Sequence, residues 1–547
     1  MKNFNVRLVI CMLSLLVTFV SCTKKDYLDE TPLARLGVEQ ALSTRQGFQD
    51  FITSLHVAAR DEIAREHDNL NYYWIMFAGT DVATWGHDGI QRIDYNNLLL
   101  PTVSAVDMVW DWAYREMLNK ANAIITYGDD PELSGIWNSE AERNAVVAEA
   151  KFFRAYTYNM LANLYGSVPI VKTLITTPKT DFERAGREEV LQFVREDLEF
   201  ASQWLPEQVS QDGRIVKAAA DHLLTEVYIS LDEYDLAISS ANRVINSGLY
   251  RLMTQRFGTE ASQPGDVFSD LFRDGNQNRS SGNMESIYVW QFEDMTPGGQ
   301  GTSNGNPRLR FWGSWYDRQL DPANKPGMVT ADSLGRGVGQ IRPNTWFIYD
   351  LWQGDFDNDI RNSPYNIRRN FYYNNPSSAY YGQLVKGLTS HVDTMRNIYP
   401  IIRKVEGKIG TLTNTSTAWS GRTYQDVMVF RLAETYLLRA EAYLKSGDPQ
   451  SAADDINVVR ARANATLVDA ADVDLDYILD ERARELMAEE PRRRTLVRTG
   501  KLVERVKLYN MRPETRNTIQ DFHRWWPIPQ SAIDANINAP LGQNTGY

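Results

Sequence analysis

The chain has 547 residues, with 58 basic and 70 acidic side chains and a formal net charge of −12. Nucleic acid and anionic bilayer surfaces repel a chain with this charge, so we expect neither as a partner. The length exceeds what one hydrophobic core usually serves, which predicts several helical layers or two subdomains. Aromatic residues make up 11% of the chain, more than a helical core needs, so we expect some rings to face solvent or a ligand.

Residues 1–21 have the features of an export signal. Lys2 and Arg7 supply positive charge, and the apolar run at 8–20 is too short to span a bilayer comfortably. The run ends in Val-Ser-Cys, which resembles the bacterial lipobox, where the cysteine is acylated and becomes the first mature residue. We expect removal of residues 1–21 and lipidation of Cys22. The alternative is an uncleaved membrane anchor with an incidental cysteine.

Cys22 is the only thiol that remains once Cys11 leaves with the signal, so no disulfide is expected within the mature chain. Attachment by several acyl chains is lasting, whereas a single chain anchors only marginally. Residues 22–42 are therefore predicted to carry the lipid and to tether the body. Loss of Lys2 and Arg7 leaves 56 of the 58 basic residues against 70 acidic ones, so the mature chain stays acidic.

Apolar residues at helical spacing occur in pairs of segments separated by short turns. Residues 219–250 hold two such segments around Asp232-Glu233, and residues 431–464 repeat the layout around Ser446-Gly447. Further helices are predicted at 112–128, 141–171 and 188–204. We expect a mainly α-helical fold in which tetratricopeptide-like pairs stack into one right-handed superhelical scaffold.

Between residues 251 and 425 the helical periodicity is lost, and Gly, Asn, Ser, Pro and aromatic residues are frequent. Such stretches are typical of long loops and short strands that project from a scaffold, and long loops are often functional. We predict an N-terminal helical part at 43–250, a loop-rich ligand-binding insertion at 251–425 and a C-terminal helical part at 426–547.

Four segments carry a specific resemblance to a known family. They are EAKFFRAYTYNMLANLYGSVPIV (149–171), IRPNTWFIYDLWQGDFDNDIR (341–361), ILDERARELMAEEPRRRTLVRTGKL (478–502) and WPIPQSAIDANINAPLGQNTGY (526–547). On these residues the chain is identified as a member of the SusD/RagB family of surface-exposed Bacteroidota lipoproteins, over residues 22–547. One departure follows Glu489, where Glu490, Arg493 and Thr495 replace the family's commoner glycine, Arg-Trp and Asp-Leu pattern. It bears on local packing and suggests a subfamily.

The resemblance implies a helical fold, a ligand site on one exposed face and a partner, a SusC-like TonB-dependent outer-membrane transporter. In that arrangement the lipoprotein covers the mouth of the transporter barrel, captures an oligosaccharide and releases it into the channel. The acidic stretch after Cys22, with Asp26, Asp29 and Glu30, resembles the surface-export signals of such lipoproteins. The resemblance therefore implies a lipid-anchored location on the outer membrane, exposed at the cell surface.

No hydrolytic or cofactor motif is present. The glycine-rich GQGTSNG (299–305) lacks dinucleotide spacing, because Asn304 stands where the third glycine is needed. Asp355, Asp357 and Asp359 resemble the start of an EF-hand loop, but Ile360 replaces its glycine. We expect a binding protein with no catalytic residues, no cofactor and no metal. The aspartates are expected in a solvated turn with helix-capping carboxylates.

Sugar binding requires an aromatic ring for the C–H face of the sugar and charged or amide groups for its hydroxyls. Two stretches supply both. In the first, Trp85 lies between Asp81 and His87, with Asp68 upstream. In the second, Arg310, Trp312 and Trp315 follow a Gly- and Asn-rich run. By family analogy, one ligand-binding loop lies in the N-terminal portion and one in the irregular middle, without any single residue being fixed.

Arg368 and Tyr372 are a weaker third pair of candidate ligand-binding residues. Each candidate also has a structural interpretation: Trp85 as a loop ring over a helix pair, Trp312 and Trp315 as packing between subdomains, and Arg368 as a helix cap or surface ion pair. The preferred function is capture of an extracellular oligosaccharide for a SusC-like transporter. Peptide capture by a SusD/RagB-type protein, a tetratricopeptide-type scaffold without a small ligand and a glycan-degrading enzyme are the alternatives.

Overall fold

A computed structural model describes residues 37–64, 75–88, 93–294, 305–331, 333–407 and 421–547, together with residues 296, 298 and 299. The predicted signal, Cys22 and Asp68 lie outside these residues. Within them the protein is mainly α-helical, as expected, with six strands in three two-stranded ladders. No helix in this described part is long and apolar enough to cross a membrane.

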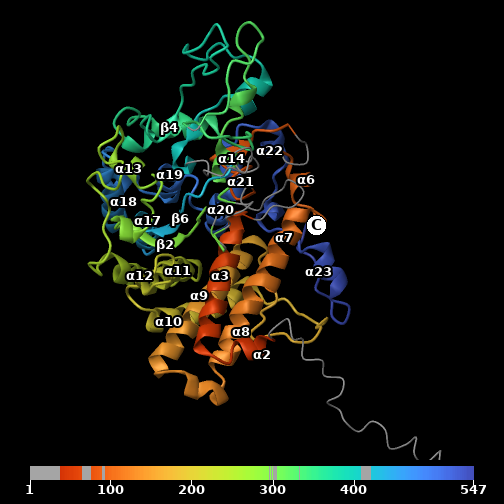
Figure 1. The fold of residues 1–547 in the computed structure, drawn as a ribbon. Helices are drawn as coiled ribbons and strands as arrows, with labels where there is room; N and C mark the ends of the chain where they lie inside the picture. The colour runs from red at the N-terminus through yellow and green to blue at the C-terminus, as the bar shows by residue number, and fades with distance from the viewer. Residues whose placement is uncertain are drawn as a thin grey trace, which may run out of the picture.

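The N-terminal helices form the lower part of the molecule in Figure 1, around the long helix α9. Ser139 caps α9, its Oγ accepting a hydrogen bond from the Glu142 N–H. A π-helical turn, η2, joins α7 and α8, and α9 packs against α3, η2 and α8. The elements are α2 (Val38–Ala41), α3 (Arg45–Ala64), β1 (Ala83–Trp85), α6 (Tyr95–Leu98), α7 (Ser104–Asp111), η2 (Trp112–Leu118), α8 (Asn119–Gly128), η3 (Pro131–Ile136) and α9 (Glu140–Leu164).

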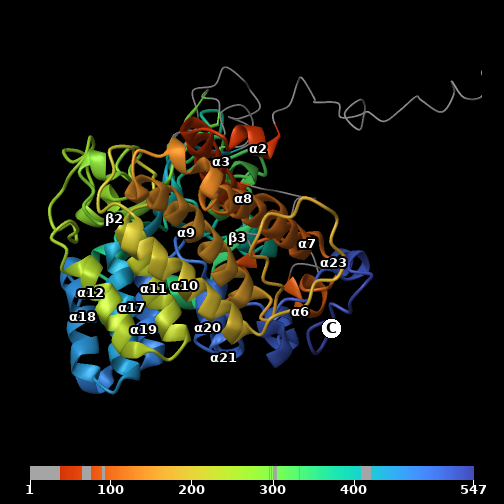
Figure 2. The same ribbon diagram turned by 90° about the horizontal axis from the view of Figure 1, so that it is seen from below.

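A row of packed helices follows, visible at the left of Figure 2. It comprises α10 (Arg187–Trp204), α11 (Lys217–Ser230), α12 (Tyr234–Ile245), α17 (Leu432–Lys445), α18 (Pro449–Arg462) and α19 (Leu475–Leu486). Asp232 at φ 61° and Gly447 at φ 90° make the tight turns within the two predicted pairs. Both predicted pairs are confirmed as helix–turn–helix units.

Helix α12 packs directly on α17, although about 190 residues separate them in the sequence. Strand β2 (Ser286–Trp290) pairs antiparallel with β6 (Val427–Arg431), with Tyr288 opposite Phe430. This ladder brings the two ends of the intervening segment together, so the helical row continues across it. The loop-rich segment is thus inserted between neighbouring helices of one scaffold.

The green-to-cyan loops that project above the helices in Figure 1 belong to the inserted segment, whose α13 and β2 lie lower, beside α17 and α18. A small core of its own includes Tyr316, Met328, Phe371, Tyr373 and Ile401. Its elements are α13 (Val267–Asp270), η4 (Arg279–Ser281), α14 (Arg308–Trp312), η5 (Tyr316–Arg318), β3 (Ile341–Pro343), α15 (Thr345–Ile348), η6 (Asp350–Trp352), η7 (Ile360–Asn362), β4 (Ile367–Arg368), η8 (Asp393–Asn397), β5 (Ile401–Ile402) and η9 (Arg403–Val405).

The C-terminal segment returns to the long helix α9. The Trp526 N–H donates to the Leu164 carbonyl, and the Asn544 amide donates to the carbonyls of Tyr165 and Trp526. This accounts for the distinctive ending of the sequence, which fastens the C-terminus to the scaffold. The last elements are η10 (Ala470–Asp472), α20 (Arg492–Arg498), α21 (Leu502–Tyr509), α22 (Pro513–Thr518), η11 (Asp521–Arg524) and α23 (Gln530–Ala535).

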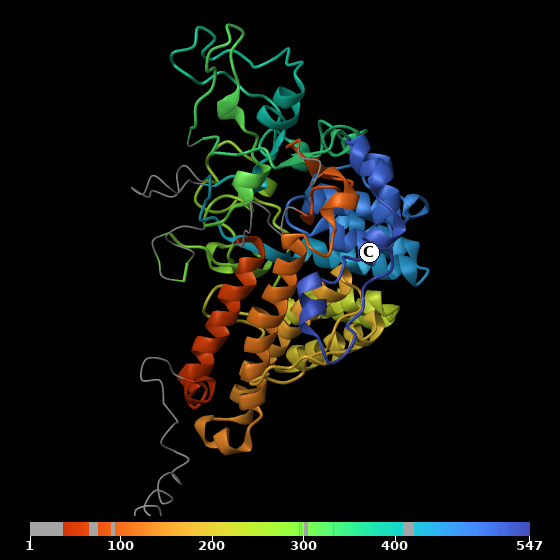
Figure 3. The same ribbon diagram turned by 90° about the vertical axis from the view of Figure 1, so that its right-hand side faces the viewer.

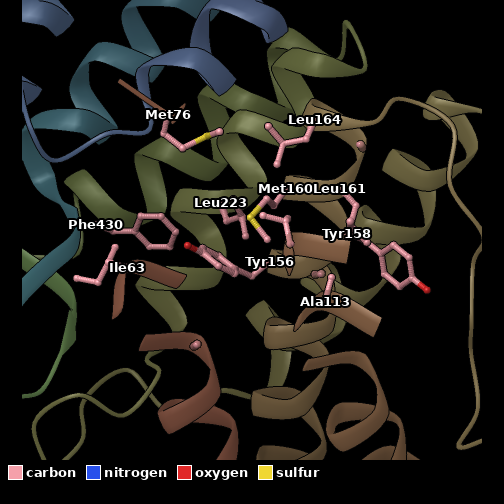
Figure 4. Close-up of a cluster of buried hydrophobic side chains, with 14 of the residues drawn as sticks. Ile63, Met76, Ala113, Tyr156, Tyr158, Met160, Leu161, Leu164, Leu223 and Phe430 are labelled. Atoms are coloured by element: carbon pink, nitrogen blue, oxygen red, sulfur yellow. The ribbon is translucent and has the colours of Figure 1, made fainter. Parts of the chain in front are cut away.

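The main hydrophobic core lies where the N-terminal helices meet the β2–β6 ladder. Figure 4 shows Tyr156 of α9 between Phe430 of β6 and Met160, with Leu223 of α11 above the ring. The Tyr156 hydroxyl donates to the Glu62 carboxylate at 2.5 Å, which satisfies the one polar atom of the ring. Segments from all three predicted parts therefore share one core.

Buried ion pairs connect the inserted segment to α19. The Arg361 guanidinium lies 2.7 Å from a Glu481 carboxylate oxygen and 3.0 Å from one of Glu485, and all three side chains are fully buried. Arg431 of β6 also contacts Glu485 at 2.5 Å. Two of the segments that carry the family resemblance, 341–361 and 478–502, are joined by this network.

Candidate functional site

Five segments meet at the base of the projection, near α14 in Figure 1 and as seen from the side in Figure 3. We call this region the loop junction and define it as residues 83–88, 305–319, 335–340, 391–397 and 421–424. It joins the N-terminal part to the inserted segment. Backbone pairing holds the junction together. Strand β1 pairs antiparallel with β3, and the Gly86 N–H donates to the Gln340 carbonyl at 3.0 Å. An antiparallel bridge joins Asn306 to Thr423.

Glycines allow the strands of the junction to approach closely. A Cβ atom at Gly337 would overlap the Gly313 carbonyl group, and one at Gly339 would meet Arg396 Cγ at 2.6 Å. Gly339 also has φ +64°, which favours glycine. The Gly-Arg-Gly-Val-Gly stretch at 335–339 is thereby pressed against 313 and 396, and it places Arg336 at the junction.

Trp315 is the half-buried aromatic ring of the junction. The guanidinium carbon of Arg396 lies 4.0 Å from its ring centroid, and that of Arg318 lies 4.9 Å away. The backbone N–H of Trp315 donates to the Arg396 carbonyl at 2.9 Å, which fixes the two residues relative to each other. Arginines that stack on an indole ring keep their N–H groups at its edge, where they can donate to a ligand.

Several polar atoms at the junction have no hydrogen-bond partner within the described residues. These are Trp315 Nε1, Arg336 Nε, Ser314 Oγ and Gln340 Oε1. Buried polar atoms are normally paired, so a cluster of unpaired ones calls for an explanation such as water or a ligand. The junction therefore combines an aromatic ring, guanidinium groups and unused hydrogen-bonding capacity.

The structure corrects the expectation for Trp85 and Trp312. Both side chains are 0% exposed: Trp85 belongs to β1, and Trp312 ends α14 and packs edge-on against Phe77 at 5.2 Å. A ring enclosed on both faces offers no surface for a sugar to stack on. These two tryptophans belong to the packing within the junction, and Trp85 does so from a strand instead of the expected loop.

Asp81 is also structural in this arrangement. Its carboxylate is fully buried between the guanidinium groups of Arg492 at 2.6 Å and Arg505 at 2.7 Å. Burial alone would raise the pKa of Asp81, but the two positive charges outweigh it and lower the pKa to about 2. Asp81 thereby ties the N-terminal loop to α20 and α21 instead of facing a ligand.

The remaining candidates lie on the inserted segment. Arg310 is half-buried in α14, and its carbonyl accepts from the Val338 N–H at 2.9 Å. Arg368 is paired with Glu406 at 2.9 Å, which matches its structural interpretation. Tyr372 is 52% exposed, because the neighbouring Phe371 and Tyr373 turn into the small core of the projection. Four candidates lie in the junction segments: Trp85 and Trp312 are buried there, and Trp315 and Arg310 are half-buried. Asp68 lies outside the described residues.

Sequence reasoning missed Arg318, Arg336 and Arg396. The glycine-rich 335–339 is a signal that could have indicated Arg336, because such a stretch allows close backbone approach. No local pattern marks Arg396, which reaches Trp315 from 81 residues further along the chain. Asp88 was likewise not selected, although it accepts from Arg512 at 2.9 Å and contacts His391 at 3.0 Å.

Of the three aspartates at 355–359, the first and last are buried in ion pairs, and Asp357 is exposed. Asp355 contacts Arg460 at 2.7 Å, and Asp359 contacts Arg361 at 2.6 Å and caps η7. Over the described ranges, no group of three or more His, Cys, Asp or Glu side chains is arranged to hold a metal ion.

Family models match most of the chain. The model described as "SusD family" matches residues 304–547, and the one described as "Starch-binding associating with outer membrane" matches residues 26–229. SusD-like protein P25 of Formosa agariphila is 24% identical over 470 residues, 81% of this chain and 80% of its own length. SusD-like protein P2 of the same organism is 26% identical over 45% of this chain, a match that spans about half (47%) of P2.

A solved structure has the same fold. Surface glycan-binding protein A from Bacteroides thetaiotaomicron, in complex with laminarihexaose, superposes with a TM-score of 0.67 at 20% identity. The superposition covers 92% of this chain and 99% of that one. From the two matched models, the relatives and the shared fold, we conclude that the chain belongs to the SusD/RagB family.

Proposed function

We propose that the protein is a cell-surface binding protein that captures an oligosaccharide at the loop junction. The observation that carries this proposal is the half-buried Trp315 ring with the Arg396 and Arg318 guanidinium groups over it. An indole face suits the C–H side of a sugar ring, and guanidinium groups suit its hydroxyls. Membership of the family and the laminarihexaose complex of a protein with the same fold support this assignment.

We further propose that a lipid on Cys22 anchors the protein to the outer membrane and that it delivers its ligand to a SusC-like TonB-dependent transporter. The lipobox-like Val-Ser-Cys and the family resemblance support both steps. One matched family model is described as associating with the outer membrane, which agrees with this location. The proposed role is binding and transfer, without chemistry on the glycan.

The test is calorimetry of the mature chain against a panel of oligosaccharides and peptides, with Trp315→Ala as the binding-site variant. Loss of the indole ring is expected to weaken saccharide binding about 30-fold or more, as for a buried aromatic anchor. Trp204→Ala is the matched control, because Trp204 is also half-buried but ends α10 in the lower scaffold, away from the junction.

Saturable binding to a saccharide that Trp315→Ala removes and Trp204→Ala keeps would support the proposal. Binding to peptides alone would replace glycan capture by peptide capture. Equal binding by both variants would move the site away from the junction. Co-purification of the anchored protein with an outer-membrane barrel, assessed separately, tests the transporter step.

A further inference from the structure

The loop junction is rich in arginine although the chain as a whole is acidic. Its five segments contain six arginines and three aspartates. The arginines are 308, 310, 318, 336, 396 and 422, and the aspartates are 88, 317 and 393. Asp88 already contacts Arg512 and His391, and Asp393 accepts from the Asn397 amide at 3.0 Å. Basic side chains therefore outnumber acidic ones within these five segments, whereas the whole chain has a net charge of −12.

Several buried arginines elsewhere in the molecule are paired with carboxylates. Arg361 contacts Asp359, Glu481 and Glu485, and Arg505 contacts Asp81, Asp476 and Asp480. Such pairing is expected, because an arginine charge removed from water is costly unless an acid compensates it.

Two arginines of the junction and one beside it have no carboxylate partner among the described residues. Across the described part of the chain, Arg318, Arg336 and the neighbouring Arg342 form no ion pair, and Arg336 donates no side-chain hydrogen bond. Arg342 is half-buried and donates only to the carbonyls of Thr394 at 3.1 Å and Pro343 at 3.2 Å, apart from a contact with the Met511 sulfur at 2.5 Å. Burial without an acid lowers the pKa of Arg342. Positive charge is thus held at the junction without its usual partners.

Resting on the proposed function, we infer that the saccharide bound at the loop junction is anionic and carries carboxylate or sulfate groups. Its sugar ring would stack at Trp315, while its acidic groups accept hydrogen bonds from Arg318 and Arg336. Guanidinium groups form paired, charge-assisted hydrogen bonds with such oxygen acids, which a neutral sugar cannot offer. A ligand of this kind supplies the counter-charge that the protein itself leaves out.

The experiment compares matched charged and neutral saccharides by calorimetry on the mature chain. One pair is oligogalacturonate and its carboxyl-reduced form; the other is a sulfated galactan oligosaccharide and its desulfated form; laminarihexaose serves as a neutral glucan. We expect a charged member to bind at least about tenfold more tightly than its neutral counterpart, in line with charged hydrogen bonds. The pair in which the charged member binds more tightly identifies carboxylate or sulfate as the recognised group. Affinity for it should fall as NaCl is raised from 50 to 300 mM.

Variants separate specific contacts from overall charge. Arg336→Gln is expected to weaken binding of the charged saccharide about tenfold and to reduce its salt dependence, whereas Arg336→Lys retains part of the affinity. Arg115→Gln removes the same charge from η2, where Arg115 is 69% exposed and paired with Asp111, and should leave affinity unchanged. Circular dichroism of each variant verifies that the helical fold is intact.

Two different results would overturn the inference, and only one of them would also overturn the proposed function. Binding of the neutral members as tightly as the charged ones, or affinity independent of salt and of Arg336, would overturn the anionic ligand and leave glycan capture in place. Failure of every saccharide, charged and neutral, to bind would overturn the proposed function and this inference with it.

Discussion

The carboxylate of Asp81 is the anion between two buried guanidinium groups, and Asp81→Asn tests how much that pairing stabilises the fold. Asparagine keeps the shape of the side chain but removes the carboxylate charge that Arg492 and Arg505 share. Breaking a buried ion pair in this way is expected to cost about 3–5 kcal/mol of unfolding free energy, measured by urea denaturation. Asp111→Asn, in an exposed pair with Arg115, is the control and should change it by less than about 1 kcal/mol.

The pKa of Asp81 also predicts a pH dependence of stability. Its pKa is about 2 in the folded protein, below the ordinary 3.8 expected for the unfolded chain. The ionised group therefore adds stability that is fully present above about pH 5 and is lost as the pH falls from about 4 toward 2, an effect of about 2 kcal/mol. The difference in unfolding free energy between wild type and Asp81→Asn should narrow over that window. A constant difference from pH 7 to pH 3 would contradict this account.

At the scale of elements, the contact of two glycine stretches sets the geometry of the junction. Gly337→Ala introduces a methyl group against the Gly313 backbone, so residues 335–339 must move away from 313–315. Overpacking of this kind is expected to cost about 1–3 kcal/mol of stability and to weaken glycan binding, because Arg336 and Trp315 are displaced. Denaturation and calorimetry measure the two effects.

Gly135→Ala provides the comparison for that variant. Gly135 has open space around its Cβ position and no positive φ, so alanine should be tolerated there with glycan affinity unchanged. Unaltered binding in Gly337→Ala would mean that the glycine contact does not position the site.

The helical row tolerates a long insertion because its ends are paired. The β2–β6 ladder holds residues 286–290 beside 427–431, so α12 can pack on α17 as if they were consecutive. Arg361 of the insertion and Arg431 of β6 both contact Glu485 of α19. Loops of the projection are thus free to carry binding residues, while the scaffold supplies stability.

At the scale of the whole molecule, attachment to the membrane is predicted to depend on one residue. Cys22→Ser removes the thiol that would be acylated, so the protein should lose radiolabelled palmitate and move from the membrane to the soluble fraction. Glycan binding by the released protein should be unchanged, since the described body begins at residue 37. Membrane retention of the serine variant would favour an uncleaved anchor. Substitution of Cys11, expected to leave with the signal, is the matched control.

The local sequence pattern was sufficient to predict the helices. Apolar spacing located α9, α10, and the pairs α11–α12 and α17–α18, because each helix buries one face and its period is written in neighbouring residues. The loss of that period marked the inserted segment, and residue types alone placed Trp315 and Arg310 among the candidates. The family resemblance added the fold and the binding role.

Tertiary structure alone decided which aromatic rings and charged groups are available to a ligand. Trp85, Trp312 and Trp315 look alike in sequence, yet the first two are enclosed and the third is half-buried beside Arg396. Asp81 finds its arginines more than 400 residues away. Burial and charge pairing are set by long-range packing, which local sequence does not encode. The sequence by itself therefore determined the helical scaffold and the class of protein, and the packed molecule determined the arginine-rich junction.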